Sequence, residues 1–241
     1  MAAAAVPNRW SSLEYGPLNT LTEIVAIDGP AGAGKSTVAR RVARELGMAF
    51  LDTGAMYRAA TWRAMKHGVP LDDPERLVAS TSSMQYQVLG DDAAPRIVLD
   101  GEDVTNRIRT PEVTGNIRCL DGIPRLREHL VAMQRELGAL RPTVAEGRDM
   151  GTVVFPGAKC KIFLDASLDS RTRRRAAEST GHGADVDLER LREDIRLRDE
   201  NDRSRAASPL RPADDAMIID TTGMSLDEVT AAIVSLARER I

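Results

Sequence analysis

The sequence predicts an α/β protein in which a parallel β-sheet is flanked by helices and interrupted by an inserted subdomain. An apolar run at 23–28 breaks into glycines and is followed by an amphipathic helical pattern over 35–46. A second apolar run at 48–51 completes the order strand, helix, strand, which predicts parallel neighbours in one sheet. Two strand-like runs at 84–89 and 96–100, separated by turn residues, indicate a hairpin that breaks this alternation.

Side-chain spacing supports the two helices on either side of the second strand. Val38, Val42 and Leu46 share one face of the first helix, as packing against a sheet requires. Gly47 follows in the position of a C-terminal cap. Thr53 is placed to cap a second helix that runs to about residue 67. A packed strand, helix, strand unit followed by a further helix is therefore expected.

The same signals divide the rest of the chain. After the hairpin, helical segments are expected to start near Pro111 and Pro124. Strand patterns resume at 143–145, 161–165 and 216–220, which adds three core strands. The predicted organisation is an N-terminal extension (1–22), a core in two pieces (23–70 and 142–241) and an inserted subdomain (71–141).

Composition and charge argue against several classes of function. The chain has 241 residues, with 33 basic and 36 acidic side chains and a net charge of −3, so it has no positive field to hold a nucleic acid or an anionic membrane. No stretch approaches the roughly 18 apolar residues of a membrane span. Cys119 and Cys160 have neither metal-ligand nor disulfide-framework spacing. We therefore expect a cytoplasmic protein without nucleic-acid or membrane partners, and a monomer, because no apolar heptad is present.

A phosphate-binding loop follows the first predicted strand. Residues 29–36 satisfy G-x-x-x-x-G-K-[ST] between a strand and a helix, which is the context that the motif needs. Its glycines let backbone N–H groups surround phosphate oxygens, and Lys35 adds a charge at the β- and γ-phosphates. The Ser36 hydroxyl is a candidate Mg²⁺ ligand. The residues expected to bind a nucleoside triphosphate, such as ATP, are Gly29, Pro30, Ala31, Gly32, Ala33, Gly34, Lys35, Ser36 and Thr37.

An arginine-dense segment lies between the last two predicted strands, from Arg171 to Arg211. Acidic residues are interleaved throughout it, which by itself is typical of a solvated helix face with i,i+4 ion pairs. The competing interpretation is a flap that closes over the triphosphate. Phosphoryl transfer needs positive charge around the moving group and exclusion of water, and arginines on a closing segment supply both. The sequence thus predicts a helical lid at about 176–210 and favours a small-molecule kinase over a motor.

Further motifs follow the phosphate loop in a defined order. With the loop they are D-G-P-A-G-A-G-K-S-T at 28–37, L-D-T-G-A-M-Y-R at 51–58, G-E-D-V at 101–104, E-G-R-D-M-G-T-V-V-F-P at 146–156, K-I-F-L-D-A at 161–166 and R-D-E-N-D-R-S-R at 198–205. Together these segments resemble the bacterial cytidylate kinases from about residue 24 to the C-terminus, and the run at 147–156 is far more specific than the phosphate loop alone. The resemblance implies a core, an acceptor-binding insert and a lid, with transfer of the γ-phosphoryl of ATP to CMP or dCMP in the presence of Mg²⁺.

The resemblance also implies roles for individual residues. Asp149 and Arg127 would read cytosine, whose N4 amino group needs a carboxylate and whose N3 and O2 need a donor. Arg58, Arg148 and Arg205 would hold the acceptor's phosphate, and Arg198 and Asp202 would reach the ribose side and the phosphates. The implied catalytic residues are Lys35, Arg148 and Arg205, and the implied acceptor-binding residues are Thr53, Tyr57, Arg58, Arg127, Arg148, Asp149, Arg198, Asp202 and Arg205.

Plainer interpretations and other functions stay open at this point. Arg148 and Asp149 could form a mutual ion pair, and Arg198 with Asp202 could be an ordinary helix salt bridge. Arg118 stands where the family usually carries a serine, and Glu146 stands where aspartate is common. The alternative functions are a kinase of another small acceptor, such as UMP, and a nucleotide-dependent binding module.

Overall fold

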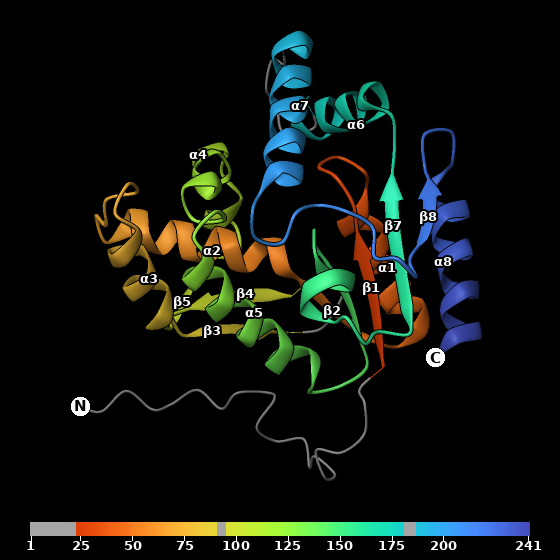
Figure 1. Ribbon diagram of the computed structural model, residues 1–241, viewed down its shortest axis with the longest axis horizontal. Helices are drawn as coiled ribbons and strands as arrows, with labels where there is room; N and C mark the ends of the chain where they lie inside the picture. Colours follow the sequence, from red (N-terminus) through yellow and green to blue (C-terminus); the bar gives the residue numbers. More distant parts are fainter. Residues whose placement is uncertain (1–22, 91–94, 181–186) are drawn as a thin grey trace. The chain divides into compact units, whose positions relative to one another are not determined.

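A computed structural model describes residues 23–90, 95–180 and 187–241 (Figure 1). Its contacts divide the chain into two compact units, one of residues 54–140 and one of residues 23–53 with 141–241. The predicted extension, the hairpin turn at 91–94 and part of the predicted lid, 181–186, lie outside the described residues. Within the described part of the chain, no helix is both long and apolar enough to span a membrane.

The larger unit is built on a five-stranded parallel sheet in the order β2-β6-β1-β7-β8. Every strand ends in an acidic residue, and because all strands run in one direction these residues gather at one edge of the sheet. Open parallel sheets bind their ligands at this edge. The sequence-based prediction of the fold class is confirmed. The strands are β1 (Ile24–Asp28), β2 (Ala49–Asp52), β6 (Thr143–Glu146), β7 (Cys160–Asp165) and β8 (Met217–Asp220).

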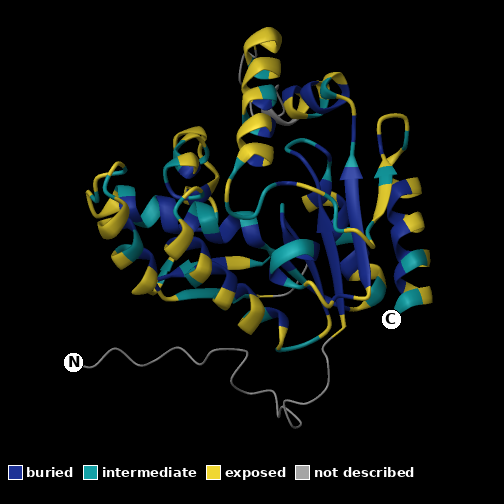
Figure 2. Cartoon of the chain, viewed as in Figure 1, coloured by how far each residue is buried: buried dark blue, intermediate teal, exposed yellow. Residues whose placement is uncertain are grey.

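Two helices pack against each other and onto the central strands to form the hydrophobic core. They are α1 (Lys35–Leu46) and α8 (Leu226–Arg240). All five residues of β1 are buried, as expected for a central strand covered on both faces (Figure 2). The last strand differs, because β8 lies at the sheet edge and Ile218 is 59% exposed.

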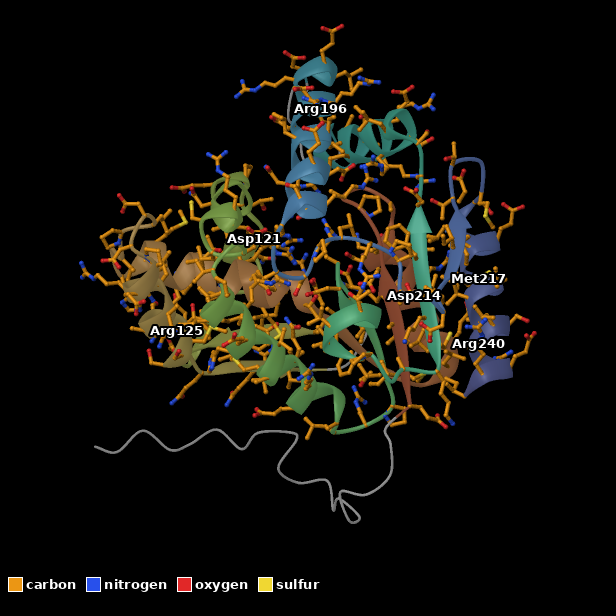
Figure 3. All side chains as sticks on the ribbon, in the orientation of Figure 1. Asp121, Arg125, Arg196, Asp214, Met217 and Arg240 are labelled. Atoms are coloured by element: carbon orange, nitrogen blue, oxygen red, sulfur yellow. The ribbon has the colours of Figure 1, made fainter. Side chains whose placement is uncertain are left out.

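The chain between β7 and β8 forms two charged helices, α6 (Leu168–Thr180) and α7 (Leu188–Ser204), which pack against each other. The partly exposed Arg196 lies on α7 (Figure 3). It forms ion pairs with Glu193, at 2.6 Å, and with Glu200. These contacts match the solvated, ion-paired helix face that interleaved charges predict. Most of the predicted lid segment is therefore helical.

The smaller unit contains the predicted hairpin, with β3 (Tyr86–Leu89) antiparallel to β4 (Arg96–Leu99). A short strand that the sequence did not predict, β5 (Glu102–Asp103), adds to β4. The helices expected near Pro111 and Pro124 begin at these prolines. The helices of this unit are α2 (Thr53–Lys66), of which residues from Gly54 onward belong here, α3 (Pro74–Ser82), α4 (Pro111–Asn116) and α5 (Pro124–Gly138), with 3₁₀ turns at Arg107–Arg109 and Ile117–Cys119.

Helix α8 begins with a reciprocal cap that gives a stability prediction. The Glu228 backbone N–H donates to the Ser225 hydroxyl at 3.2 Å, and the Ser225 N–H donates to the Glu228 carboxylate at 2.8 Å. We expect Ser225→Ala to lower the free energy of unfolding by about 1 kcal/mol, measured by urea denaturation, because an N–H of the first turn loses its acceptor. Ser235→Ala, on an exposed position of the same helix, is the control, and equal losses in both variants would contradict the capping role.

Candidate active site

The phosphate-binding loop lies where the sequence predicted it, between β1 and α1. Gly29 has a φ of +148°, and a Cβ atom there would lie 2.1 Å from the carbonyl oxygen of Leu164 on β7. Glycine at this position therefore allows the loop to pass directly over the neighbouring strand. The main chain of the loop therefore lies directly against β7 at Gly29.

Lys35 begins α1 and is 6% exposed. Its ammonium group donates to the carbonyl oxygen of Pro30, at 2.8 Å, within the same loop. Burial lowers the pKa of Lys35, and the nearby Arg148 charge lowers it further. A phosphate anion placed against this ammonium would supply the negative charge that the buried cation lacks.

Ser36 and Glu146 form an oxygen-rich pair beside the loop. The Ser36 hydroxyl donates to the Glu146 carboxylate at 2.6 Å, and Glu146 ends β6 beside β1. Burial and the neighbouring Asp52 raise the pKa of Glu146. Hydroxyl and carboxylate oxygens are the donors that Mg²⁺ prefers, so these two residues fit a magnesium ion that also binds phosphate oxygens.

Glu146 is not among the metal ligands that the sequence predicts, although it stands where the family commonly carries aspartate. The signal that would have found it is an acidic residue at the end of the strand next to the phosphate loop. Thr53, which the sequence predicts as an acceptor-binding residue, also has a structural contact. Its hydroxyl donates to the main-chain oxygen of Glu146 at 2.7 Å. In the described structure, Thr53 thus holds the end of β6.

Asp28, at the end of β1, holds the turn that carries the most specific motif. Its two carboxylate oxygens accept the N–H groups of Met150 and Gly151, each at 2.8 Å. These residues begin the π-helical turn Met150–Val154, directly after the buried Asp149. Asp28 is 3% exposed, and burial raises its pKa to about 7, with the Asp149 charge acting in the same direction. The sequence did not single out this positioning role.

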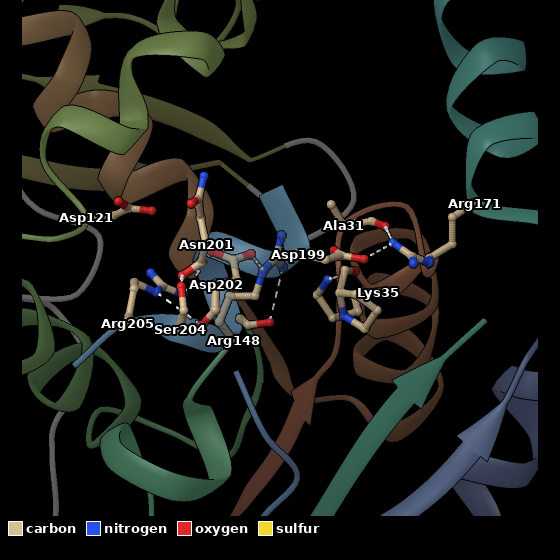
Figure 4. Close-up of polar contacts among 12 residues, drawn as sticks. Ala31, Lys35, Asp121, Arg148, Arg171, Asp199, Asn201, Asp202, Ser204 and Arg205 are labelled. Carbon is tan, nitrogen blue, oxygen red and sulfur yellow. Dashed lines mark hydrogen bonds and ion pairs between the residues drawn. The ribbon is translucent and has the colours of Figure 1, made fainter. Parts of the chain in front are cut away.

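Three predicted site residues form one ionic network (Figure 4). The Asp202 carboxylate lies 2.8 Å from Nε of Arg148 and 3.0 Å from Nη2 of Arg205. Burial by itself would raise the pKa of Asp202, but Arg148 and Arg205 hold it below its usual value. The charge of Arg198 also acts on Asp202 and on Lys35. The structure therefore brings the end of α7 to the phosphate loop and the end of β6.

The remaining predicted residues lie in the smaller unit. The guanidinium group of Arg127 lies 5.5 Å from the centre of the Tyr57 ring and donates to the carbonyl oxygen of Asp121 at 3.2 Å. Arg127 is 5% exposed, so it is not the surface charge that its helix would suggest. Arg58 follows Tyr57 on α2 and is half-buried.

Comparison with known proteins gives a consistent result. A family model described as cytidylate kinase matches residues 25–239. A cytidylate kinase of Rhodopirellula baltica is 50% identical over 216 residues, which cover 90% of this chain and 93% of that protein. A cytidylate kinase of Desulforamulus reducens is 49% identical over 211 residues, covering 88% and 95%. A bifunctional pantoate ligase/cytidylate kinase of a Synechococcus species is 48% identical over 219 residues, which cover 90% of this chain and 40% of that longer protein.

The raised pKa of Asp28 gives a pH-dependent prediction. Since the folded state binds this proton more tightly than the unfolded chain does, the stability contributed by Asp28 falls as pH rises from about 4 to about 7. The difference in free energy of unfolding between the wild type and Asp28→Asn should decline across this window with a slope approaching about 1.4 kcal/mol per pH unit. Urea denaturation at several pH values measures it, and a pH-independent difference would rule out the raised pKa.

Proposed function

This chain belongs to the cytidylate kinase family, and from that premise we propose that it transfers the γ-phosphoryl group of ATP to CMP or dCMP, giving CDP or dCDP and ADP. The observation that carries the proposal is the network in which Asp202 holds Arg148 and Arg205 beside the phosphate loop. A loop of this kind binds the donor in many classes of protein. Paired arginines next to it are suited to a second phosphate group, which a monophosphate acceptor brings.

On the donor side, residues 29–37 bind the phosphates of ATP through main-chain N–H groups and Lys35. Ser36 and Glu146 hold Mg²⁺, which neutralises charge on the β- and γ-phosphates when it is bound. Lys35 is buried, and burial lowers its pKa although the Glu146 and Asp202 charges act in the opposite direction, so the bound phosphates stabilise its charged form. The loop thus orients the γ-phosphoryl group and offsets the charge that spreads over it during transfer.

On the acceptor side, Arg148 and Arg205 hold the phosphate of the nucleoside monophosphate, and Arg58 is proposed as a further ligand of this phosphate. Arg198 and Asp202 act at the ribose side and the phosphates. Asp202 keeps the two guanidinium groups oriented before the substrate arrives, so little reorganisation is needed in the transition state. The transferred group is loosely bonded at that point, and fixed positive charge is what stabilises it.

For the base, the Asp149 carboxylate accepts a hydrogen bond from the N4 amino group of cytosine. Arg127 donates hydrogen bonds to N3 and O2 of the same base. Asp149 is buried at the start of the turn that Asp28 fixes, so its carboxylate is held on a rigid support. Arg127 is ordered by the Tyr57 ring and by a main-chain carbonyl. The proposal also places the enzyme in the cytoplasm, a reducing compartment that suits its two free cysteines, and treats it as a monomer.

Acceptor identity is tested with a panel of nucleotides. With ATP and Mg²⁺, we expect ADP release to be fastest with CMP and dCMP, and slower by orders of magnitude with UMP, AMP, GMP or shikimate. A coupled assay for ADP measures all of these under one set of conditions. If another acceptor is preferred, the base-reading assignment fails; if none supports turnover, the transferase proposal itself is wrong.

The role of Asp149 gives a sharper prediction. Asp149→Ala should lower the ratio of kcat/KM for CMP over UMP by about 10-fold or more, because a charged hydrogen bond to the N4 amino group contributes about 1.5–3 kcal/mol. Asp214→Ala, at a fully exposed carboxylate of the same unit, is the control and should leave the ratio unchanged. An unchanged ratio in Asp149→Ala would remove this residue from base recognition.

A further inference from the structure

Arg171 belongs to the arginine-dense segment, yet it does not lie on the solvated face. It is 5% exposed and sits on the first turn of α6. Its Nε donates to the carbonyl oxygen of Ala166 at 2.9 Å, and its Nη1 donates to the carbonyl oxygen of Ala31 at 3.0 Å. The same Nη1 lies 2.6 Å from the Asp199 carboxylate (Figure 4). A single guanidinium group therefore contacts three separate segments of the chain.

These contacts include the phosphate loop itself. Ala31 lies in the middle of the loop, and its carbonyl oxygen is held by a side chain from outside the loop. Packing is equally close at the next residue, since a Cβ atom on Gly32 would lie 3.1 Å from Cβ and from the carbonyl oxygen of Arg171. The orientation of the loop's peptide groups, which decides where its N–H groups point, therefore depends on α6 at Arg171.

The third contact leads to α7. Asp199 is 3% exposed, and its other oxygen, Oδ1, has no hydrogen-bond partner among the described residues. Arg171 forms the direct ion pair with this buried carboxylate, and the charge of Arg148 also acts on it. Asp199 directly follows Arg198 and lies one helical turn before Asp202. The position of Asp199 thus sets the position of the α7 residues that face the phosphate loop.

We propose that Arg171, through its ion pair with Asp199, is a positioning residue for phosphoryl transfer. It fixes the position of the Ala31 carbonyl of the phosphate loop relative to the α7 turn that carries Arg198 and Asp202. The proposal rests on the proposed function, because it concerns the alignment of donor and acceptor groups. Arg171 acts through the loop and the helix rather than on the reacting atoms.

A purely structural role is the competing explanation, but buried ion pairs are inefficient as stabilising devices. The cost of removing both charges from water often matches or exceeds their attraction. An exposed ion pair already joins the same two helices, with Arg192 Nε 3.0 Å from the Asp169 carboxylate. The buried pair differs from it in contacting the phosphate loop, which is the feature that alignment requires.

The experiment compares two ion pairs that join α6 and α7, the buried pair Arg171–Asp199 and the exposed pair Arg192–Asp169. We expect Arg171→Gln to lower kcat for CMP by ~30-fold or more and to weaken ATP binding several-fold, since small misplacements of reacting groups cost up to about 100-fold in rate. Asp199→Asn keeps the side-chain shape and should lower kcat in the same direction. Arg192→Gln and Asp169→Asn are the matched controls and should stay within about twofold of the wild type.

Additional measurements separate positioning from stability. All rates are taken well below the melting temperature of each variant, which is determined in parallel. The double variant Arg171→Gln/Asp199→Asn should be no slower than the slower single variant, because coupled residues give non-additive effects. Arg171→Lys retains the charge but not the fork of donors, so it should recover part of the lost rate.

Two results would overturn the proposal: melting temperatures that fall while kcat is unchanged, or equal losses in the buried and exposed pairs. If the wild type phosphorylates no cytidine nucleotide, the proposed function fails separately. The positioning role is then judged from the Kd of a non-hydrolysable ATP analogue, which Arg171→Gln should weaken and Arg192→Gln should not. Equal Kd values in these two variants would reject it.

Discussion

Strand β1 lies between β6 and β7, and the parallel pairing on its two sides determines where the phosphate loop and the Glu146 carboxylate can be. Ile27 pairs with Glu146 on one side and with Ile162 on the other. The loop that leaves β1 therefore starts beside the Glu146 carboxylate and passes over Leu164 with no room for a Cβ atom at Gly29. If this register shifted by one residue, Glu146 would turn to the other face of the sheet. The hydroxyl of Ser36 would then lose its carboxylate partner.

Buried charge is the second constraint on the site. Asp28, Lys35, Glu146 and Asp202 are each at most 6% exposed, and a charge removed from water is tolerated only where hydrogen bonds or opposite charges compensate it. Asp202 has two arginines, whereas Asp28 has two backbone N–H groups and still has a raised pKa. The charge of Lys35 is less well compensated, because burial lowers its pKa. Anionic phosphates would therefore stabilise the charged form of Lys35, so the electrostatics of the larger unit favour the ligands proposed for it.

Arg171 and Arg196 show how far sequence reasoning reaches. Both lie in one charged segment with interleaved acids, and a solvated helix face is the ordinary expectation for such a pattern. Arg196 fulfils it with Glu193 and Glu200. Arg171 is buried instead, because α6 places its side chain between the phosphate loop and α7. Helical spacing gives the partners within one helix, but it does not reveal contacts with a loop 140 residues earlier in the chain.

The sequence by itself determined the parallel αβ core, the phosphate loop, the hairpin and the helices that begin at Pro111 and Pro124, because these depend on local periodicity, on turn and capping residues and on a contiguous motif. Tertiary structure alone decided that Asp28 holds the Met150–Val154 turn, that Glu146 meets Ser36, and that Arg171 joins the loop to Asp199. These contacts connect residues 110, 122 and 140 positions apart. Burial and strand register bring such residues together, and both are properties of the packed chain rather than of any segment of it.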